Sequence, residues 1–310
     1  MSEQAKKRTG KPSLKIHWRL CQGEEQEGKQ YLSSGCGLQR TRYGMTQAPG
    51  VGKVDLEHQL TFAREAEQLG FDSLLVDFNL KKPDPTLLAL ALGLQTEKIK
   101  FIIACRSGLM APGYFVQQLN TLSHLIPQRF SLNVVAGHSP KEQQAYGDFL
   151  DHDQRFARTC EFLEVCRQLW TNAEQVDFCG DYYRLFNARV GTPFLPDNSH
   201  GPECFIAGSS PQALSLAAEQ GDTWVSLARL PHEMAPQADQ ILSAGKEVAI
   251  RLSVICRPTR AQAWAAAEHL VAYGEEDAAA VASVKAAEKA FVRQSDSHGI
   301  KQSHREANSD

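Results

Sequence analysis

Short apolar runs alternate with amphipathic segments along most of the chain. In residues 55–69 the apolar side chains recur every three or four positions, which indicates a helix with one buried face. Asp55 can cap the first turn of this helix and Gly70 can end it. The predicted strands are Leu14–Leu20, Ser73–Val76, Ile99–Cys105, Phe130–Val135, Cys204–Ile206, Trp224–Leu227 and Ile250–Ile255. The predicted helices are Asp55–Leu69, Asp84–Leu94, Phe115–Leu125, Asp153–Trp170, Pro211–Gln220, His232–Ser243 and a last one from Ala261.

These predicted strands are rich in β-branched apolar residues, as is typical of strands buried on both faces of a parallel sheet. A helix follows each strand, and the fold that best matches this order is a (β/α)8 barrel. Residues 275–310 are charged and show no eighth strand. The predicted fold class is therefore an α/β, TIM-type (β/α)8 barrel that lacks the eighth strand and helix.

The same pattern divides the chain into segments. Residues 1–13 are polar and basic, and we expect them to be disordered. Residues 14–274 form the predicted barrel domain, in which the long polar stretch 21–53 is expected to be an active-site loop. The Gly- and aromatic-containing residues 176–198 are an insert that could form a small hairpin beside the barrel. Residues 275–310 form a charged tail.

Composition narrows the kind of partner. The chain has 310 residues, 42% hydrophobic and 22% charged, which is enough to bury a large core. A net charge of −3 gives no reason to expect nucleic acid or an anionic membrane as partner. The basic N-terminus has no apolar signal region, and no segment reaches the roughly 18 apolar residues of a membrane span. We expect a cytoplasmic protein that binds a small molecule or another protein.

The eight cysteines form no CxxC pair, and several lie inside apolar runs. They are predicted to be reduced thiols of the core. The histidines, cysteines and carboxylates show no spacing typical of zinc ligands, so no metal site is predicted.

The sharpest local signal is the turn Gly208-Ser209-Ser210, which connects a predicted strand to a helix. Backbone N–H groups at a helix N-terminus favour an anion, glycine permits close approach of a phosphate, and serine hydroxyls add hydrogen bonds. The alternative is that Ser209 or Ser210 only caps the helix, and from sequence alone capping is the more frequent arrangement.

Two polar residues interrupt apolar strands. Asn133 needs hydrogen-bond partners that either a ligand or the neighbouring backbone could supply. Arg251 needs an anion, which could be a bound phosphate or sulfonate, or an acidic residue on a covering helix if the side chain faces outward.

Three histidines are further candidates for functional residues. His138 and His152 flank a segment just beyond the fourth predicted strand, where either could titrate near neutral pH in a pocket. His17, on the first predicted strand, is less well placed for a role in the site. For each of the three, a surface position or a satisfied core position is the alternative.

Several stretches resemble the luciferase-like flavin-dependent monooxygenases. They are residues 129–137, 148–156, 161–165, 176–180 and the Gly208–Ser210 turn. Residues 249–252 and 257–268 resemble the alkanesulfonate monooxygenase branch in particular. The similarity runs in order from about Leu14 to Val292, and the tail after residue 275 resembles a mobile lid insertion.

This resemblance implies a two-component enzyme. Reduced FMN (FMNH2) from a separate flavin reductase would react with O2 and oxidise a small organic substrate, such as a sulfonate. By position, it implies that Gly208, Ser209 and Ser210 hold the FMN phosphate and that Asn133 and His152 bind the flavin. The implied catalytic residues are Arg251, Arg106 and His138. The active protein is expected to be a homo- or hetero-oligomer.

The chain departs from the alkanesulfonate pattern at several positions. Ser253 stands where those enzymes have a histidine, and it cannot act as a general base at neutral pH. Phe156 replaces a phosphate-contacting tyrosine, and the region around Pro83 has no counterpart of a pocket cysteine. A second hypothesis is therefore a non-catalytic or truncated homologue that pairs with a complete enzyme. A third is an oxidoreductase that binds a reduced deazaflavin or another phosphate ligand.

Overall fold

The computed structural model describes residues 14–20, 54–80, 82–137, 140–171, 174–196, 200–252 and 254–265. In these residues, seven parallel strands form one curled sheet in the order β1-β2-β3-β4-β7-β8-β9. The strands are β1 His17–Arg19, β2 Ser73–Val76, β3 Lys100–Cys105, β4 Phe130–Val134, β7 Cys204–Ala207, β8 Thr223–Leu227 and β9 Glu247–Arg251. The TIM-type fold is thus confirmed, and the described residues contain no eighth strand in this sheet.

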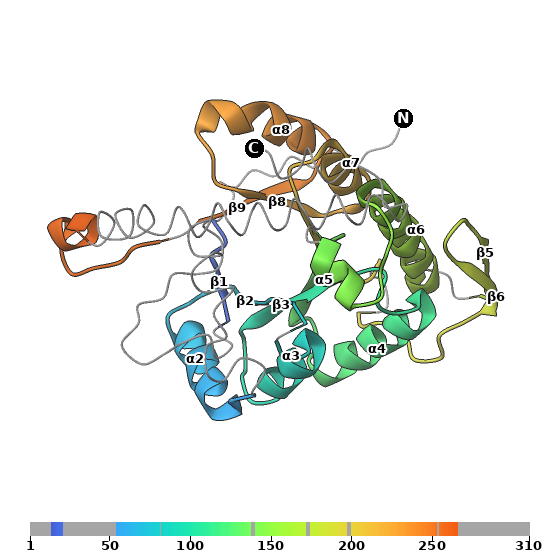
Figure 1. The fold of residues 1–310 in the computed structure, drawn as a ribbon. Helices are drawn as coiled ribbons and strands as arrows, with labels where there is room; N and C mark the ends of the chain where they lie inside the picture. The colour runs from blue at the N-terminus through green and yellow to red at the C-terminus, as the bar shows by residue number, and fades with distance from the viewer. Residues whose placement is uncertain are drawn as a thin grey trace, which may run out of the picture.

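Helices cover the outside of the curled sheet, as Figure 1 shows. They are α2 Leu56–Gln68, α3 Pro85–Gly93, α4 Pro112–Leu125, α6 His152–Thr171, α7 Pro211–Gln220 and α8 Pro231–Ser243. The carboxylate of Asp55 caps α2 as expected and accepts from His58 N, and the carboxylate of Asp84 caps α3 and accepts from Thr86 N and Leu87 N. The short helix α5, Pro140–Ala145, lies inside the ring of helices (Figure 1) and was not predicted.

Successive side chains along each strand point alternately to the two faces of the sheet, so the strand sequence shows which residues face the helices and which face the inside of the curl. On β3, Phe101 and Ile103 belong to the main core beneath the helices. Ile102 and Ala104 are also buried, and because successive strand residues point to opposite faces, they face the inside of the curl. On β4 the corresponding inward residue is Asn133, which pairs with Ala104 in the ladder.

A two-stranded antiparallel hairpin, β5 Val176–Cys179 and β6 Arg184–Ala188, lies at one side of the barrel (Figure 1). It occupies the insert in which a hairpin was expected. The carboxylate of Glu161 on α6 accepts hydrogen bonds from the backbone N–H groups of Asp181, Tyr182 and Tyr183 at 3.0, 2.9 and 2.5 Å. These bonds fasten the hairpin turn to the helix.

Two predictions were wrong in detail. The last strand covers Glu247–Arg251 rather than Ile250–Ile255, so Arg251 is its final residue. Cys105, Cys166 and Cys204 are buried and reduced as expected, but Cys179 and Cys256 are exposed. The predictions for residues 1–13, 21–53 and 275–310 lie outside the described residues.

The edges of the sheet, β1 and β9, approach each other because the sheet curls (Figure 1). Near the N-terminal ends of the strands, the Lys15 ammonium lies 3.0 Å from Glu247 and 3.9 Å from Glu203. The Lys15–Glu247 ion pair therefore connects the two edges, which form no hydrogen-bond ladder with each other in the described part of the chain. No helix among the described residues is long and apolar enough to cross a membrane.

Candidate functional site

The carboxyl ends of all seven strands meet at one edge of the curled sheet, which we call the mouth. Polar residues follow these strands directly: Asp77 after β2, Arg106 after β3, the Gly208–Ser210 turn after β7, and Arg251 at the end of β9. Parallel strands place these residues on the same side of the barrel. Of the residues selected from the sequence, Arg106, Gly208–Ser210 and Arg251 lie at the carboxyl ends of their strands, and Asn133 lies within β4.

The Gly208–Ser210 turn begins helix α7. Gly208 has φ +143°, and a Cβ there would lie 2.7 Å from the Cβ of Ala213, so the turn requires glycine. Its carbonyl accepts a hydrogen bond from the buried indole of Trp224 at 2.7 Å. The Ser210 hydroxyl accepts from Ala213 N at 3.2 Å and caps the helix, whereas Ser209 is exposed. Capping is therefore present. Because Pro211 has no N–H group and Leu214 N donates to the Ser210 carbonyl, Gln212 N is the N–H group of this turn that is left for an anion.

The first turn of α6 lies beside the first turn of α7. Asp153 Oδ1 accepts from Gln212 Nε2 at 3.1 Å and lies 2.9 Å from His152 Nδ1. The His152 ring packs against Phe156 with 4.7 Å between centroids. The structure thus places His152 close to the start of α7. His138 lies outside the described residues.

Asn133 faces the inside of the sheet and carries an unsatisfied atom. Its Oδ1 is buried and has no hydrogen-bond partner. Of the two alternatives that the sequence left open, neighbouring backbone does not satisfy this oxygen. A buried acceptor of this kind fits a ligand that donates an N–H or O–H group.

Arg106 is enclosed at the mouth. Its Nη2 donates to Glu142 Oε2 at 2.8 Å, and its guanidinium lies 4.9 Å from the Phe78 ring centroid and 5.4 Å from that of Tyr146. Its Nε and Nη1 are buried and have no hydrogen-bond partner. These two donors fit an acceptor on a bound molecule.

The Asp77 carboxylate interacts with cationic side chains from both edges of the sheet. Its carboxylate lies 2.9 Å from Arg19 Nε on β1, and Lys82 Nζ donates to both of its oxygens at 2.8 Å. Burial acts to raise the pKa of Asp77, but Arg19, Lys82 and Arg251 together hold that pKa below its ordinary value. Arg251 therefore acts on this inward-facing cluster, which the sequence did not predict.

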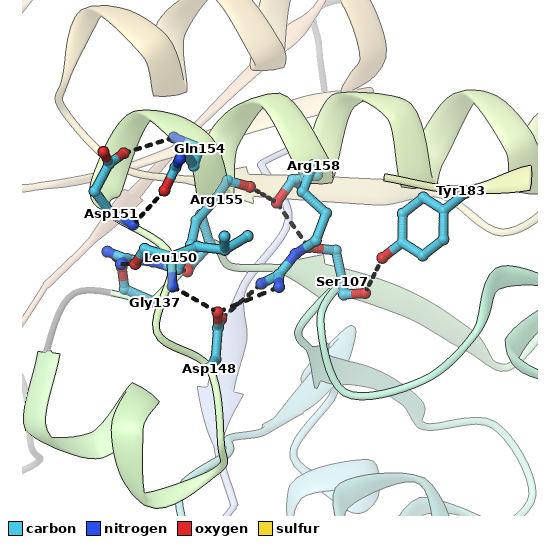
Figure 2. A network of polar contacts seen from close by, with 11 residues as sticks. Ser107, Gly137, Asp148, Leu150, Asp151, Gln154, Arg155, Arg158 and Tyr183 are labelled. Carbon is cyan, nitrogen blue, oxygen red and sulfur yellow. Dashed lines mark hydrogen bonds and ion pairs between the residues drawn. The ribbon is translucent and has the colours of Figure 1, made fainter. Parts of the chain in front are cut away.

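A second polar network, which the sequence also did not predict, holds the loop between β4 and α6 (Figure 2). Arg155 donates to the carbonyls of Ala136, Leu150 and Gly137 at 3.0, 2.6 and 3.3 Å. Arg158 forms two bonds to Asp148, at 3.2 and 2.6 Å. Because both arginines use carbonyls or a carboxylate of the chain itself, this network is structural.

His17 and the buried thiols do not form a reactive site. The His17 Nδ1 lies 2.5 Å from Ser73 Oγ near the start of the strands, and burial lowers the pKa of the imidazole. Burial likewise raises the pKa of the Cys204 thiol to about 12, so this thiol stays protonated. Among the described residues, no three His, Cys, Asp or Glu side chains come together in a way that could hold a metal ion.

A curled parallel sheet with helices outside and polar side chains at the carboxyl ends of its strands defines a TIM-type α/β protein with its site at the mouth. The model of the luciferase-like monooxygenase family matches residues 38–309. The chain therefore belongs to the luciferase-like monooxygenase family.

Solved structures of similar fold include three with different activities. Riboflavin lyase RcaE, solved with a modified FMN and riboflavin, is 21% identical with a TM-score of 0.63, and the match covers 69% of this chain and 59% of that one. EDTA monooxygenase EmoA from Chelativorans sp. BNC1 is 20% identical with a TM-score of 0.64, over 88% and 69%. An F420-dependent secondary alcohol dehydrogenase, in complex with an F420-acetone adduct, is 24% identical with a TM-score of 0.55, over 64% and 65%.

These similarities establish the fold, since each identity is below 25%. The chain spans 59% of the length of riboflavin lyase and 69% of that of EDTA monooxygenase. The activities named for these proteins differ, so they do not identify a substrate for this chain.

Proposed function

We propose that the chain acts as the oxygenase component of a two-component system. It would bind FMNH2 from a separate reductase and oxidise a small organic substrate with O2. The observation that carries this proposal is the position of the Gly208–Ser210 turn, which begins α7 at the same edge of the sheet as the unsatisfied Asn133 Oδ1. A flavin with its phosphate at that turn and its ring system over β4 would contact both the start of α7 and the Asn133 oxygen.

The chain's own residues would bind the cofactor and exclude water. The Gln212 N–H group at the start of α7 and the exposed Ser209 hydroxyl would hold the phosphate, because a helix N-terminus favours an anion. The Trp224 indole donates a hydrogen bond to the Gly208 carbonyl and so holds the turn in place. The bound reduced flavin would supply the electrons that activate oxygen.

The charges around Asp77 support an anionic substrate. Arg19, Lys82 and Arg251 contribute three positive charges to one carboxylate, and they lie at the mouth where β1, β2 and β9 end. Sulfonates and carboxylates are therefore the substrate classes to test first.

The phosphate site can be tested at Ser209, because this side chain does not cap the helix. We expect Ser209→Asp to weaken FMN binding at least tenfold, since the carboxylate repels the phosphate. Ser209→Asn is the neutral control of similar size. Riboflavin, which has no phosphate, should bind both variants within threefold of the original chain. Equal losses for FMN and riboflavin would show that the phosphate lies elsewhere.

Oxygenation itself can be tested with 18O2. The full chain, a flavin reductase, NADH and FMN are supplied with an alkanesulfonate or an uncharged alkane, and the product is analysed by mass spectrometry. Incorporation of one 18O atom that requires the chain supports the proposal. Tight FMNH2 binding without any oxygenated product would contradict the catalytic part.

A supporting subunit is the second candidate. The observation that favours it is that β1 and β9 are open edges within the described residues. In that case the isolated chain would bind flavin weakly, and native mass spectrometry of the protein from its own cells would find it paired with a different, complete homologue.

A further inference from the structure

The two edge strands carry exposed apolar side chains on the outer face of the sheet. Trp18 on β1 pairs with Leu74, which is fully buried beneath the helices, so Trp18 points to the same outer face. Val248 on β9 pairs with the fully buried Trp224, and Ile250 follows Val248 by two positions on that face. Trp18 and Ile250 are nevertheless 44% and 52% exposed. The part of the chain that the structure describes therefore leaves this outer face uncovered where the two edges approach each other.

The exposed side chains of the two strands lie level with each other. On the inner face, the Lys15 ammonium lies 3.0 Å from the Glu247 carboxylate. Trp18 follows Lys15 by three positions, and Ile250 follows Glu247 by three. In parallel strands this spacing places them at the same height and on the opposite, outer face. The seam face, as we call this exposed apolar group, consists of Ile16, Trp18, Ile250 and Leu252.

The neighbouring helices cover each edge strand only on the side toward the centre of the sheet. The Trp18 ring contacts Phe71, which follows α2, with 5.2 Å between ring centroids. Val248 packs against the core, and α8 contacts β9. An exposed apolar surface between two helices is typical of a site that another polypeptide segment covers.

The chain itself contains a segment with a matching apolar stripe. Within residues 277–292, apolar side chains at intervals of four, three and four residues fall along one side of a helix, and they are Ala280, Val284, Ala287 and Phe291. The cationic residues of the same stretch, Lys285 and Lys289, fall on other sides of that helix. The stripe therefore has the composition that an apolar sheet face requires.

This segment is connected closely enough to reach the seam face. Residues 252–276 join it to β9, and even a fully helical chain of that length spans about 35 Å. The five residues of β9 span only about 17 Å. The connection therefore allows the segment to lie along either edge strand.

We propose that residues 277–292 form an amphipathic helix that docks on the seam face. The stripe covers the apolar side chains of β1 and β9 and holds the two edges together on the outer face, as the Lys15–Glu247 pair does on the inner face. A helix uses its own backbone groups internally, so the two edges stay without a ladder between them. This inference does not depend on flavin binding, and its tests use the chain without flavin.

The first test measures the exposure of Trp18 by hydroxyl-radical footprinting of the purified full chain. Val284→Asp places a charge in the stripe, and Ala286→Asp, the matched control, places the same charge on another side of the helix. We expect Val284→Asp to raise the oxidation rate of Trp18 at least threefold relative to the exposed Tyr114 on α4. Ala286→Asp should leave this ratio unchanged.

Two outcomes of the footprinting would contradict the proposal. Equal oxidation of Trp18 in all three chains would show that residues 277–292 do not cover the seam face. Protection of Trp18 that increases with protein concentration would assign the seam face to a second copy of the chain.

The second test changes the seam face and measures the segment. Trypsin cleaves after Lys285 and Lys289, and docking should slow this cleavage because a protease needs the locally opened chain. We expect Ile250→Glu to speed cleavage at both sites at least tenfold in the full chain. Leu87→Glu, at an exposed position on α3, is the control and should leave the rate unchanged. Equal cleavage rates in the original chain and both variants would overturn the proposed docking.

Discussion

At the scale of single residues, Asp77 shows how one carboxylate connects distant parts of the mouth. Its cationic neighbours come from β1, from the loop after β2 and from β9. The Lys82 side chain is only 4% exposed, and the Asp77 carboxylate compensates the charge of its ammonium. Because the pKa of Asp77 is lower in the folded chain than in the unfolded chain, the carboxylate stabilises the fold above its unfolded pKa. That contribution is lost as the pH falls through the folded pKa.

We expect Asp77→Asn to lower the free energy of unfolding by about 2 kcal/mol at pH 7, because it removes the carboxylate that pairs with Arg19 and Lys82. The difference from the original chain should begin to shrink as the pH falls below about 4, the ordinary pKa of an aspartate, and should be lost once the pH is below the lowered pKa of Asp77 in the folded chain. Urea unfolding of both chains at pH 7 and at a pH below about 4 measures this difference in the free energy of unfolding. Asp239→Asn, at an exposed position on α8, is the control and should change little at either pH. A pH-independent loss would assign the effect to packing.

The sequence identified candidate site residues best where a polar residue interrupts a predicted apolar strand. Asn133 and Arg251 were selected as candidates because each is a polar residue in a predicted apolar strand, and the structure places Asn133 within β4 and Arg251 at the end of β9. The Asp77 cluster could not be predicted, since its partners are far apart in sequence and meet only through the curl of the sheet. Ser210 remained undecided between capping and anion binding because both use the same local pattern.

At the scale of elements, the β5–β6 hairpin depends on one side chain of another element. Glu161 on α6 accepts three backbone hydrogen bonds from the hairpin turn. Gly180 leaves room for this, because a Cβ there would lie 2.4 Å from the Glu161 carboxylate. The Tyr183 hydroxyl adds a bond to the Ser107 carbonyl at 2.7 Å. The hairpin is thus held to the barrel at its turn.

Glu161→Ala should therefore release the hairpin turn. We expect the amides of Tyr182 and Tyr183 to exchange with deuterium about 30-fold faster, which corresponds to about 2 kcal/mol of local stability. Amides of β3 and β4 should change far less. Glu164→Ala, on an exposed position of the same helix, is the matched control. Unchanged exchange at the turn would mean that hairpin packing alone holds it.

Most elements followed from hydrophobic periodicity, and the failures have physical causes. Helix α5 has six residues, too few to show a helical period. The last strand was placed too late because Ile250, Leu252 and Val254 form an alternating apolar pattern. In the structure these three side chains are exposed, and the strand ends at Arg251 where pairing with β8 ends.

At the scale of the whole molecule, the sheet has a protected centre and two open edges. Strands β3 and β4 each pair on both sides, whereas β1 and β9 pair on one side within the described residues. The Lys15–Glu247 ion pair that connects the edges is half exposed, and such a pair contributes about 1 kcal/mol or less. It does not replace a hydrogen-bond ladder.

Hydrogen exchange of the isolated chain should therefore become faster from the centre of the sheet toward its edges. We expect amides of β3 and β4 to be the most protected and those of β1 and β9 the least. Adding 0.5 M salt should weaken the Lys15 pairs and speed exchange at both edges, by less than about fivefold. Equal protection across all seven strands would indicate that a further strand closes the barrel in solution.

The three buried thiols offer a way to follow the integrity of this architecture. Cys105, Cys166 and Cys204 come from β3, α6 and β7, and desolvation raises the pKa of each. An alkylating reagent needs a thiolate, so it should modify the exposed Cys179 and Cys256 while sparing these three. Labelling of Cys105, Cys166 and Cys204 in peptide mass spectra would then record how often the sheet and α6 separate, and a ligand that seals the mouth should slow it.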